Sequence, residues 1–170
     1  YNYGKNLSIK EDTTIESFVS EIQYEGGIDS LDMNDTRKVA LSEIAENVPN
    51  GKICKWLSDA ETDLQVGVTL SEGKKRISVV FRGSESKSDW YYDFMIVKQP
   101  LTMDGLTKSP PVNVHSGFLT QLTTNDVYAS LVDTVKKLIQ DYPDYEVCIT
   151  GHSLGGALST LFGFMISHEI

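Results

Sequence analysis

Gly151-His152-Ser153-Leu154-Gly155-Gly156 is the stretch that decides the fold of this chain. It has the G-x-S-x-G pattern of a nucleophile elbow, a sharp strand-to-helix turn that presents a serine hydroxyl. A hydrophobic run over residues 145–150 precedes it and a helix start rich in small residues follows, which is the setting that the motif requires. Ser153 would stand at a helix N-terminus, where the dipole and free N–H groups favour developing negative charge. The pattern indicates that Ser153 is a nucleophile. The competing interpretation is a tight structural turn in which the serine has no catalytic role.

Hydrophobic periodicity on both sides of the elbow predicts an α/β fold. Strand-like runs cover residues 53–57, 64–70 and 77–81, with a turn at Glu72-Gly73-Lys74 and a continuously apolar stretch at 79–81 that indicates a strand covered on both faces. Helices are expected over about 36–47, 116–139 (with a break near 123–125) and 154–166, and a loop over 99–111. Residues 145–150 read as a buried strand. This order implies a largely parallel sheet with helices on its faces.

Bulk composition narrows the class of protein. The 170 residues suit one domain, 1–170, in which the polar residues 1–33 are expected to form an N-terminal arm. A net charge of −9 argues against nucleic acid as a partner, and no apolar run is long enough to predict a transmembrane helix. Cys54 and Cys148 form no disulfide or metal pattern, and Cys148 reads as a buried thiol. We expect no metal and no cofactor, and the compartment stays open.

Four segments of this chain form one pattern when they are taken in order. They are Val79-Val80-Phe81-Arg82-Gly83-Ser84, Asp89-Trp90-Tyr91-Tyr92-Asp93-Phe94, Val114-His115-Ser116-Gly117-Phe118 and Gly151 to Gly156. In this order they resemble the class 3 lipases, the fungal-type triacylglycerol lipases with an α/β-hydrolase fold. The resemblance spans roughly residues 64–168 and is loose over residues 1–50.

The resemblance implies a role for residues that match the family's motifs. Ser153 would be the acylated nucleophile within the elbow residues Gly151, His152 and Gly155, and the oxyanion hole would be formed by Ser84 and by the backbone N–H of Leu154. Asp93 would help to hold Ser84, or is simply a helix-end carboxylate; Arg82 and His115 would be structural. A lid would be formed by Ser86, Lys87, Ser88, Asp89, Trp90, Tyr91 and Tyr92. Its aromatic side chains suit an oil–water interface; the competing interpretation is that they pack on the core.

The acid and the base of a catalytic triad are not found in the sequence. In folds built on this elbow they follow the serine in the order Asp/Glu, His, and only 17 residues follow Ser153. His168 lies fifteen residues further along the same expected helix, about 22 Å away at 1.5 Å per residue. His152 is expected to point away from its neighbour, and His115 lies in a structural segment. The chain therefore reads as the N-terminal part of the fold, ending just after the elbow.

If the rest of the fold lies elsewhere, two apolar surfaces are expected to be poorly covered. One is the sheet edge beside 145–150, and the other is the helix that carries Leu161, Phe162, Phe164, Met165 and Ile166. The triad Asp and His would then come from a longer polypeptide or from a complementing C-terminal chain.

The predicted activity is hydrolysis of carboxylic esters through an acyl-enzyme on Ser153, with a triacylglycerol at an oil–water interface as substrate. Within the same class, a phospholipase A1, galactolipase or feruloyl esterase remains an alternative. From a different class, the alternative is a catalytically inactive lipase-like binding or signalling module.

Overall fold

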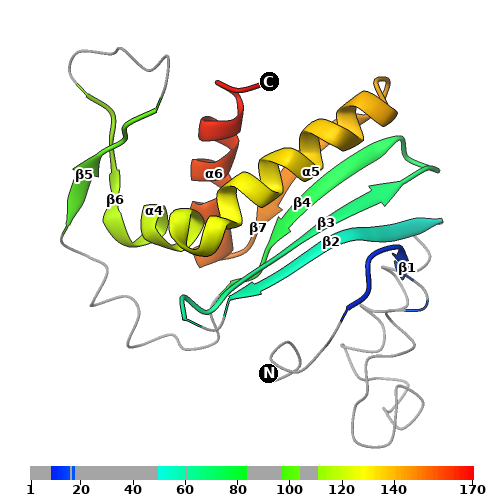
Figure 1. The fold of residues 1–170 in the computed structure, drawn as a ribbon, viewed down its shortest axis with the longest axis horizontal. Coiled ribbons are helices and arrows are strands. Elements are labelled where there is room, and N and C mark those ends of the chain that lie inside the picture. The colour runs from blue at the N-terminus through cyan, green and yellow to red at the C-terminus, as the bar shows by residue number, and fades with distance from the viewer. Residues whose placement is uncertain (1–8, 16, 18–49, 60, 84–96, 104–110) are drawn as a thin grey trace, which may run out of the picture.

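A computed structural model describes residues 9–15, 17, 50–59, 61–83, 97–103 and 111–170 (Figure 1). The helix predicted over 36–47 and most of the predicted N-terminal arm lie outside these residues. Of that arm, Thr13 and Thr14 are described as strand β1 (Thr13–Thr14), which pairs with the central sheet, and Ile15 next to it is buried.

Five strands of the described chain form one twisted sheet in the order β1-β2-β3-β4-β7. Besides β1 they are β2 (Gly51–Asp59), β3 (Leu64–Ser71), β4 (Arg76–Phe81) and β7 (Glu146–Gly151). The expected strands at 53–57, 64–70 and 77–81 are therefore confirmed, as is the turn after Glu72, where the Lys75 amide donates to the Glu72 carbonyl.

The described part of this sheet is mixed rather than largely parallel. The pairs β1–β2, β2–β3 and β3–β4 are antiparallel, because short turns join β2 to β3 and β3 to β4. Only β4 and β7 run parallel, and α4 and α5 lie between them in the sequence, as a parallel crossover requires. The expectation of a parallel sheet thus holds for the strand pair that leads to the elbow. The α/β class itself is confirmed.

One face of the sheet is buried and the other is partly open. Ile77, Val79 and Phe81 alternate along β4 and are buried, whereas Val80 between them is 41% exposed. The prediction that 79–81 is covered on both faces was therefore wrong for Val80. Strand β7 is likewise half-buried rather than buried, because it is the last strand of the described sheet, and Cys148 on it is only partly covered.

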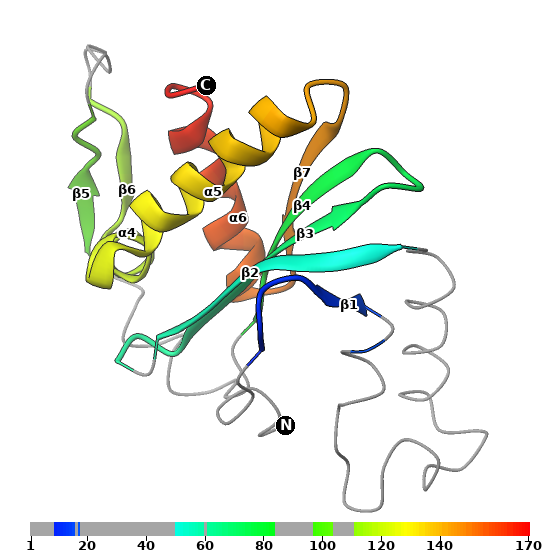
Figure 2. The same ribbon diagram turned by 45° about the vertical axis from the view of Figure 1, so that its right-hand side comes forward.

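The helices whose bounds the structure describes pack on the buried face (Figures 1 and 2). They are α4 (Ser116–Thr123), the short 3-10 helix η2 (Thr124–Asp126), α5 (Val127–Asp141) and α6 (Leu154–Ile166). The predicted break is confirmed: Asn125 and Asp126 take φ of 52° and 58°, which turns the chain from α4 into α5. No helix of the described chain has both the length and the apolar character to cross a membrane.

Helix α6 is better covered than the sequence predicted. Phe162 is fully buried, with its ring 5.6 Å from that of Phe81 on the sheet and 5.7 Å from that of Tyr128 on α5. Leu161, Met165 and Ile166 are buried as well, and Phe164 is half-buried. The prediction of a poorly covered helix was wrong because the sheet, α4 and α5 already enclose most of its apolar side chains.

The stretch expected as a loop begins with two residues of a strand and is followed closely by a second strand. β5 (Lys98–Pro100) and β6 (Asn113–His115) form a two-stranded antiparallel hairpin beside the main body (Figure 2). Pro100 is tolerated because it closes a short edge strand. The prediction of a loop over 99–111 was therefore wrong for Gln99 and Pro100.

Candidate active site

The turn between β7 and α6 holds Ser153 in a conformation that few side chains adopt. Its φ of 54° and ψ of −121° belong to a region favoured by glycine, which costs on the order of 1–3 kcal/mol for other residues. Hydrogen bonds fix the turn: the Gly155 amide donates to the His152 carbonyl at 2.9 Å, and the Gly156 amide to the Ser153 carbonyl at 2.9 Å. The Ser153 side chain is exposed and does not cap the helix that it begins. A serine held this way is presented to solvent at a helix N-terminus.

Glycines make this geometry sterically feasible. A Cβ on Gly155 would collide with the carbonyl of Phe81 at the end of β4, and a Cβ on Gly151 would collide with the backbone of Gly155. Helix α6 therefore packs directly on two strand ends, an approach that the absence of a Cβ at Gly151 and Gly155 permits.

The end of β4 meets the elbow at Gly83. A Cβ on Gly83 would lie 2.7 Å from the His152 carbonyl oxygen and 3.6 Å from the Cβ of Ser153. The residue that follows is Ser84, which lies outside the described residues, as do Asp93 and every residue of the predicted lid. The sequence did not predict the contact between Gly83 and the elbow, because these residues are far apart in the chain and meet only through the pairing of β4 with β7.

The Leu154 amide is available as a hydrogen-bond donor. The amides of Gly155, Gly156 and Ala157 donate to the carbonyls of His152 and Ser153. That of Leu154 has no hydrogen-bond partner in the part of the chain that the structure describes. An unused N–H beside an exposed serine, at the positive end of a helix dipole, can stabilise an anion there.

Arg82 and His115 have structural contacts, in agreement with the sequence analysis. The Arg82 Nη2 lies 3.4 and 3.3 Å from the two carboxylate oxygens of Asp63, in the turn between β2 and β3. The His115 Nδ1 accepts a hydrogen bond from the Gly117 amide at 3.2 Å and so caps α4. Its ring also packs on that of Phe118, at a centroid distance of 4.5 Å.

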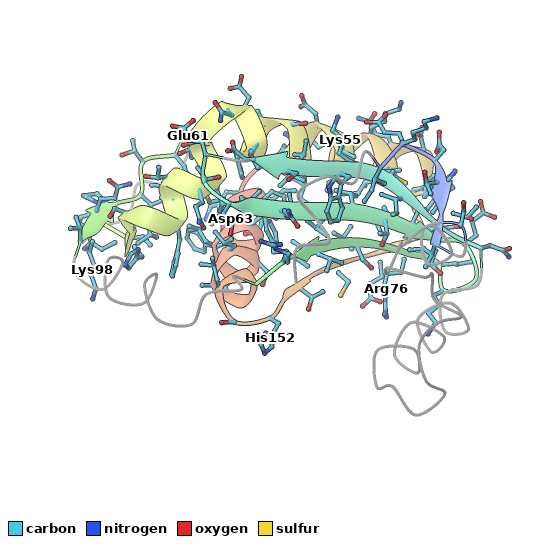
Figure 3. All side chains as sticks on the ribbon, turned by 90° about the horizontal axis from the view of Figure 1, so that it is seen from below. Lys55, Glu61, Asp63, Arg76, Lys98 and His152 are labelled. Atoms are coloured by element: carbon cyan, nitrogen blue, oxygen red, sulfur yellow. The ribbon has the colours of Figure 1, made fainter. Side chains whose placement is uncertain are left out.

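None of the three histidines is placed as a base for Ser153. His168 lies beyond the C-terminal end of α6, where its Nδ1 is 2.8 Å from the Phe164 carbonyl. His152 projects from the β7–α6 turn away from the body of the molecule (Figure 3). Across the described side chains, no three His, Cys, Asp or Glu residues are grouped as a metal site.

A cluster at the far end of α6 shifts two pKa values. The Tyr128 hydroxyl donates to Glu169 Oε1 at 2.7 Å, and Lys136 Nζ pairs with Glu169 Oε2 at 3.1 Å. The hydrogen bond from Tyr128, followed by the one from Lys136, lowers the pKa of Glu169. Burial, together with the Glu169 carboxylate, raises the pKa of Tyr128 well above its usual value. These contacts connect the chain just after α6 to α5. The cluster therefore lies near the C-terminal end of α6, whereas Ser153 lies at its N-terminal end.

Known proteins of one family match this chain. A family model described as "Lipase (class 3)" matches residues 78–169, more than half of the chain. A lipase of Rhizomucor miehei is 39% identical over 113 residues, covering 65% of this chain and 28% of the relative. A secreted alkaline triacylglycerol lipase of Penicillium cyclopium is 35% identical over 109 residues, covering 64% of this chain and 38% of the relative.

Solved structures match as well. A triacylglycerol lipase from Penicillium expansum superposes with a TM-score of 0.60 at 33% identity, covering 68% of this chain and 44% of that one. The likeness confirms the predicted α/β-hydrolase fold. The chain spans less than half the length of each of these relatives. The strand-elbow-helix unit around Ser153 and the match over residues 78–169 lead to one conclusion: the chain belongs to the class 3 lipase family.

Proposed function

We propose that the protein hydrolyses carboxylic esters, with Ser153 as the nucleophile. The observation that carries this proposal is the strained backbone of Ser153, an exposed serine held at φ 54° beside an unused helix amide. Strain of this kind persists only where the surrounding structure maintains it, and it gathers at functional sites. The family relationship supports the same assignment.

The reaction would proceed in two steps. The Ser153 oxygen adds to the ester carbonyl while a general base takes its proton, and the carbonyl oxygen becomes an anion. Collapse of this tetrahedral intermediate expels the alcohol, which takes up the proton, and leaves the acyl group on Ser153. Water then adds to the acyl-enzyme in the same way and releases the acid, restoring the hydroxyl.

The oxyanion would be stabilised by two backbone donors. One is the Leu154 amide, at the start of α6. The other is the amide of Ser84, the residue after Gly83, whose described contact with the elbow supports this assignment. Asp93 is proposed to hold Ser84 in place. Removal of one such donor typically costs about 10²–10³ in rate.

The base and its acidic partner are proposed to come from outside these 170 residues. The described positions of His115, His152 and His168 support this view, because none of them is directed at Ser153. The two groups would be supplied by the same polypeptide or by a complementing chain. The experiments below therefore use the intact protein that contains this chain.

The proposed substrate is a triacylglycerol, because the named activity of similar proteins from two Penicillium species is triacylglycerol hydrolysis. The test compares hydrolysis of an emulsified triacylglycerol, a diacyl phospholipid and a feruloyl ester by the intact protein. Preference for the triacylglycerol supports the proposal, whereas preference for one of the others assigns the protein to that branch. No hydrolysis of any ester would support the inactive binding module instead.

The role of the Leu154 amide has a matched pair of variants. Leu154→Ala keeps the N–H and Leu154→Pro removes it, and proline is tolerated at the first position of a helix. We expect Leu154→Pro to lower kcat by about 10²–10³ and Leu154→Ala to lower it far less. Equal losses in the two variants would contradict the backbone role.

The segment from Ser86 to Tyr92 is proposed to be a lid that opens at a lipid surface. Its aromatic residues Trp90, Tyr91 and Tyr92 suit a half-wet position. Opening would uncover acyl-binding surface and exclude water from the site. Hydrolysis of a short-chain ester should then rise sharply as the substrate passes its solubility limit; a smooth curve through that limit would contradict the lid.

A further inference from the structure

A hydrogen bond beyond the last residue of β4 also holds the end of this strand against β3. The Arg82 amide donates to the Gln65 carbonyl on β3 at 2.9 Å, one residue beyond the last residue of β4. After it the chain reaches Gly83, which abuts the elbow. The Arg82 backbone therefore lies next to the elbow, where a Cβ on Gly155 would be 3.0 Å from the Arg82 carbonyl carbon.

Asp63 is an acidic partner of the Arg82 side chain. Its carboxylate lies 3.4 and 3.3 Å from Arg82 Nη2 through its two oxygens, and the side chains are 29% and 25% exposed, respectively. A partly buried pair of charges is screened less by solvent and salt than an exposed one. The pair therefore restrains Arg82 more firmly than a surface ion pair would.

Asp63 is itself fixed in position. Its φ of 55° places it in the left-handed region, as a tight turn requires. The carbonyl of the preceding residue, Thr62, accepts a hydrogen bond from Gln121 Nε2 on α4 at 2.9 Å, and Gln121 is 2% exposed. The turn is thus anchored to helix α4 on one side and to the end of β4 on the other.

From these contacts we infer that Asp63 is a positioning residue for the oxyanion hole. Through Arg82 it holds Gly83 at the elbow, against the His152 carbonyl and the Cβ of Ser153. This inference rests on the proposed function and extends it to a turn that contributes no catalytic group. Rate depends on such spacing, because a displacement of about 1 Å in a catalytic group can cost on the order of 10²-fold.

A second ion pair on the same strand provides a matched control. Arg76, at the other end of β4, donates to Glu146 Oε2 at 2.9 and 3.2 Å, with side chains 42% and 67% exposed. Figure 3 shows Asp63 and Arg76 at opposite ends of the sheet, with His152 near the Asp63 end. Breaking this pair removes an ion pair from β4 without reaching the elbow.

The test compares Asp63→Asn with Glu146→Gln in the intact protein. Asparagine keeps the shape of aspartate and tolerates a positive φ, so the variant removes the charge without straining the turn. With a water-soluble ester, we expect Asp63→Asn to lower kcat about tenfold, less than removal of a whole oxyanion donor, and to change KM less than about twofold. Glu146→Gln should leave both constants unchanged, and the melting temperatures of the two variants should be similar.

Two further variants separate positioning from general loss of stability. Arg82→Lys keeps a cation that can reach Asp63 and should retain more kcat than Arg82→Gln. The double variant Asp63→Asn with Arg82→Gln should have the kcat of Arg82→Gln alone. Once Arg82 is replaced, the Asp63–Arg82 ion pair is already lost, so replacing Asp63 removes nothing more from it. In hydrogen exchange, the Arg82 amide should exchange faster in Asp63→Asn than in Glu146→Gln.

The outcomes distinguish this inference from the function on which it rests. If the wild type hydrolyses esters with Ser153 and Asp63→Asn has the same kcat as Glu146→Gln, the positioning role is wrong and the proposed function stands. A fall in kcat that matches a fall in melting temperature, with no rescue by Arg82→Lys, also overturns it. If the wild type has no Ser153-dependent hydrolysis, both the function and the inference fall.

Discussion

At the scale of the residue, Ser153 combines an exposed hydroxyl with a backbone that suits glycine. Gly-x-Ser-x-Gly predicted the elbow from the sequence, since the glycines at 151 and 155 are what the close packing of α6 requires. The sequence could not predict the contact of Gly83 with the carbonyl of His152. That contact joins residues far apart in the chain, and only the register of β4 beside β7 brings them together.

The strain at Ser153 predicts a difference between two inactive variants. Ser153→Gly and Ser153→Ala both remove the hydroxyl, but only glycine relieves the positive φ. We expect Ser153→Gly to be more stable than Ser153→Ala by about 1 kcal/mol, the lower part of the usual range for such strain. Urea unfolding of the two variants measures this difference. Equal midpoints would show that the serine backbone is relaxed.

At the scale of the element, α6 is positioned at its start by backbone contacts and at its end by side chains. The sequence predicted its range because its apolar residues are continuous, and it predicted a break before α5 from the polar run at 123–125. It did not predict how well α6 is covered, because coverage depends on α4, α5 and the sheet together. The strand at 98–100 was missed because Pro100 favours a loop when only local signals are considered.

Two glycines of α6 should respond oppositely to alanine. A Cβ on Gly163 would lie 3.6 Å from Ile149 Cδ1, an ordinary contact, so Gly163→Ala should stabilise the protein by about 0.5–1 kcal/mol. A Cβ on Gly155 would collide with the Phe81 carbonyl, so Gly155→Ala should destabilise it by about 1–3 kcal/mol and reduce activity. Urea midpoints of both variants provide the comparison. A neutral Gly155→Ala would contradict the close packing of α6 on β4.

The other end of α6 should make stability depend on pH. Because the folded-state pKa of Glu169 is lowered from 4.5, its contribution is present above that value and is lost as pH falls through the lower, folded-state pKa. We therefore expect the stability difference between wild type and Glu169→Gln to be constant near neutral pH and to shrink below 4.5. Tyr128→Phe removes the hydroxyl that donates to Glu169, so it should reduce the pH dependence of this stability difference. A difference that is flat down to strongly acidic pH would contradict the contacts of Glu169.

At the scale of the whole molecule, the described chain brings together Ser153, which we propose as the nucleophile, the Leu154 amide, and Gly83, the residue before Ser84. The α/β-hydrolase fold and the family were predictable because four motifs occur in the right order. The mixed character of the described sheet was less predictable, because parallel and antiparallel strands share the same apolar alternation and differ in how they are connected. Ser84, Asp93 and the lid remain predictions.

The most direct test of the central claim is labelling of the intact protein with a fluorophosphonate, followed by identification of the modified residue by mass spectrometry. The reagent phosphonylates a serine whose hydroxyl is activated by a base: the serine oxygen bonds to phosphorus, fluoride leaves, and the base takes the proton. We predict a single modified site, Ser153, and loss of labelling in Ser153→Ala. A folded intact protein that is not labelled at Ser153, under conditions that label a known serine esterase, would contradict the account.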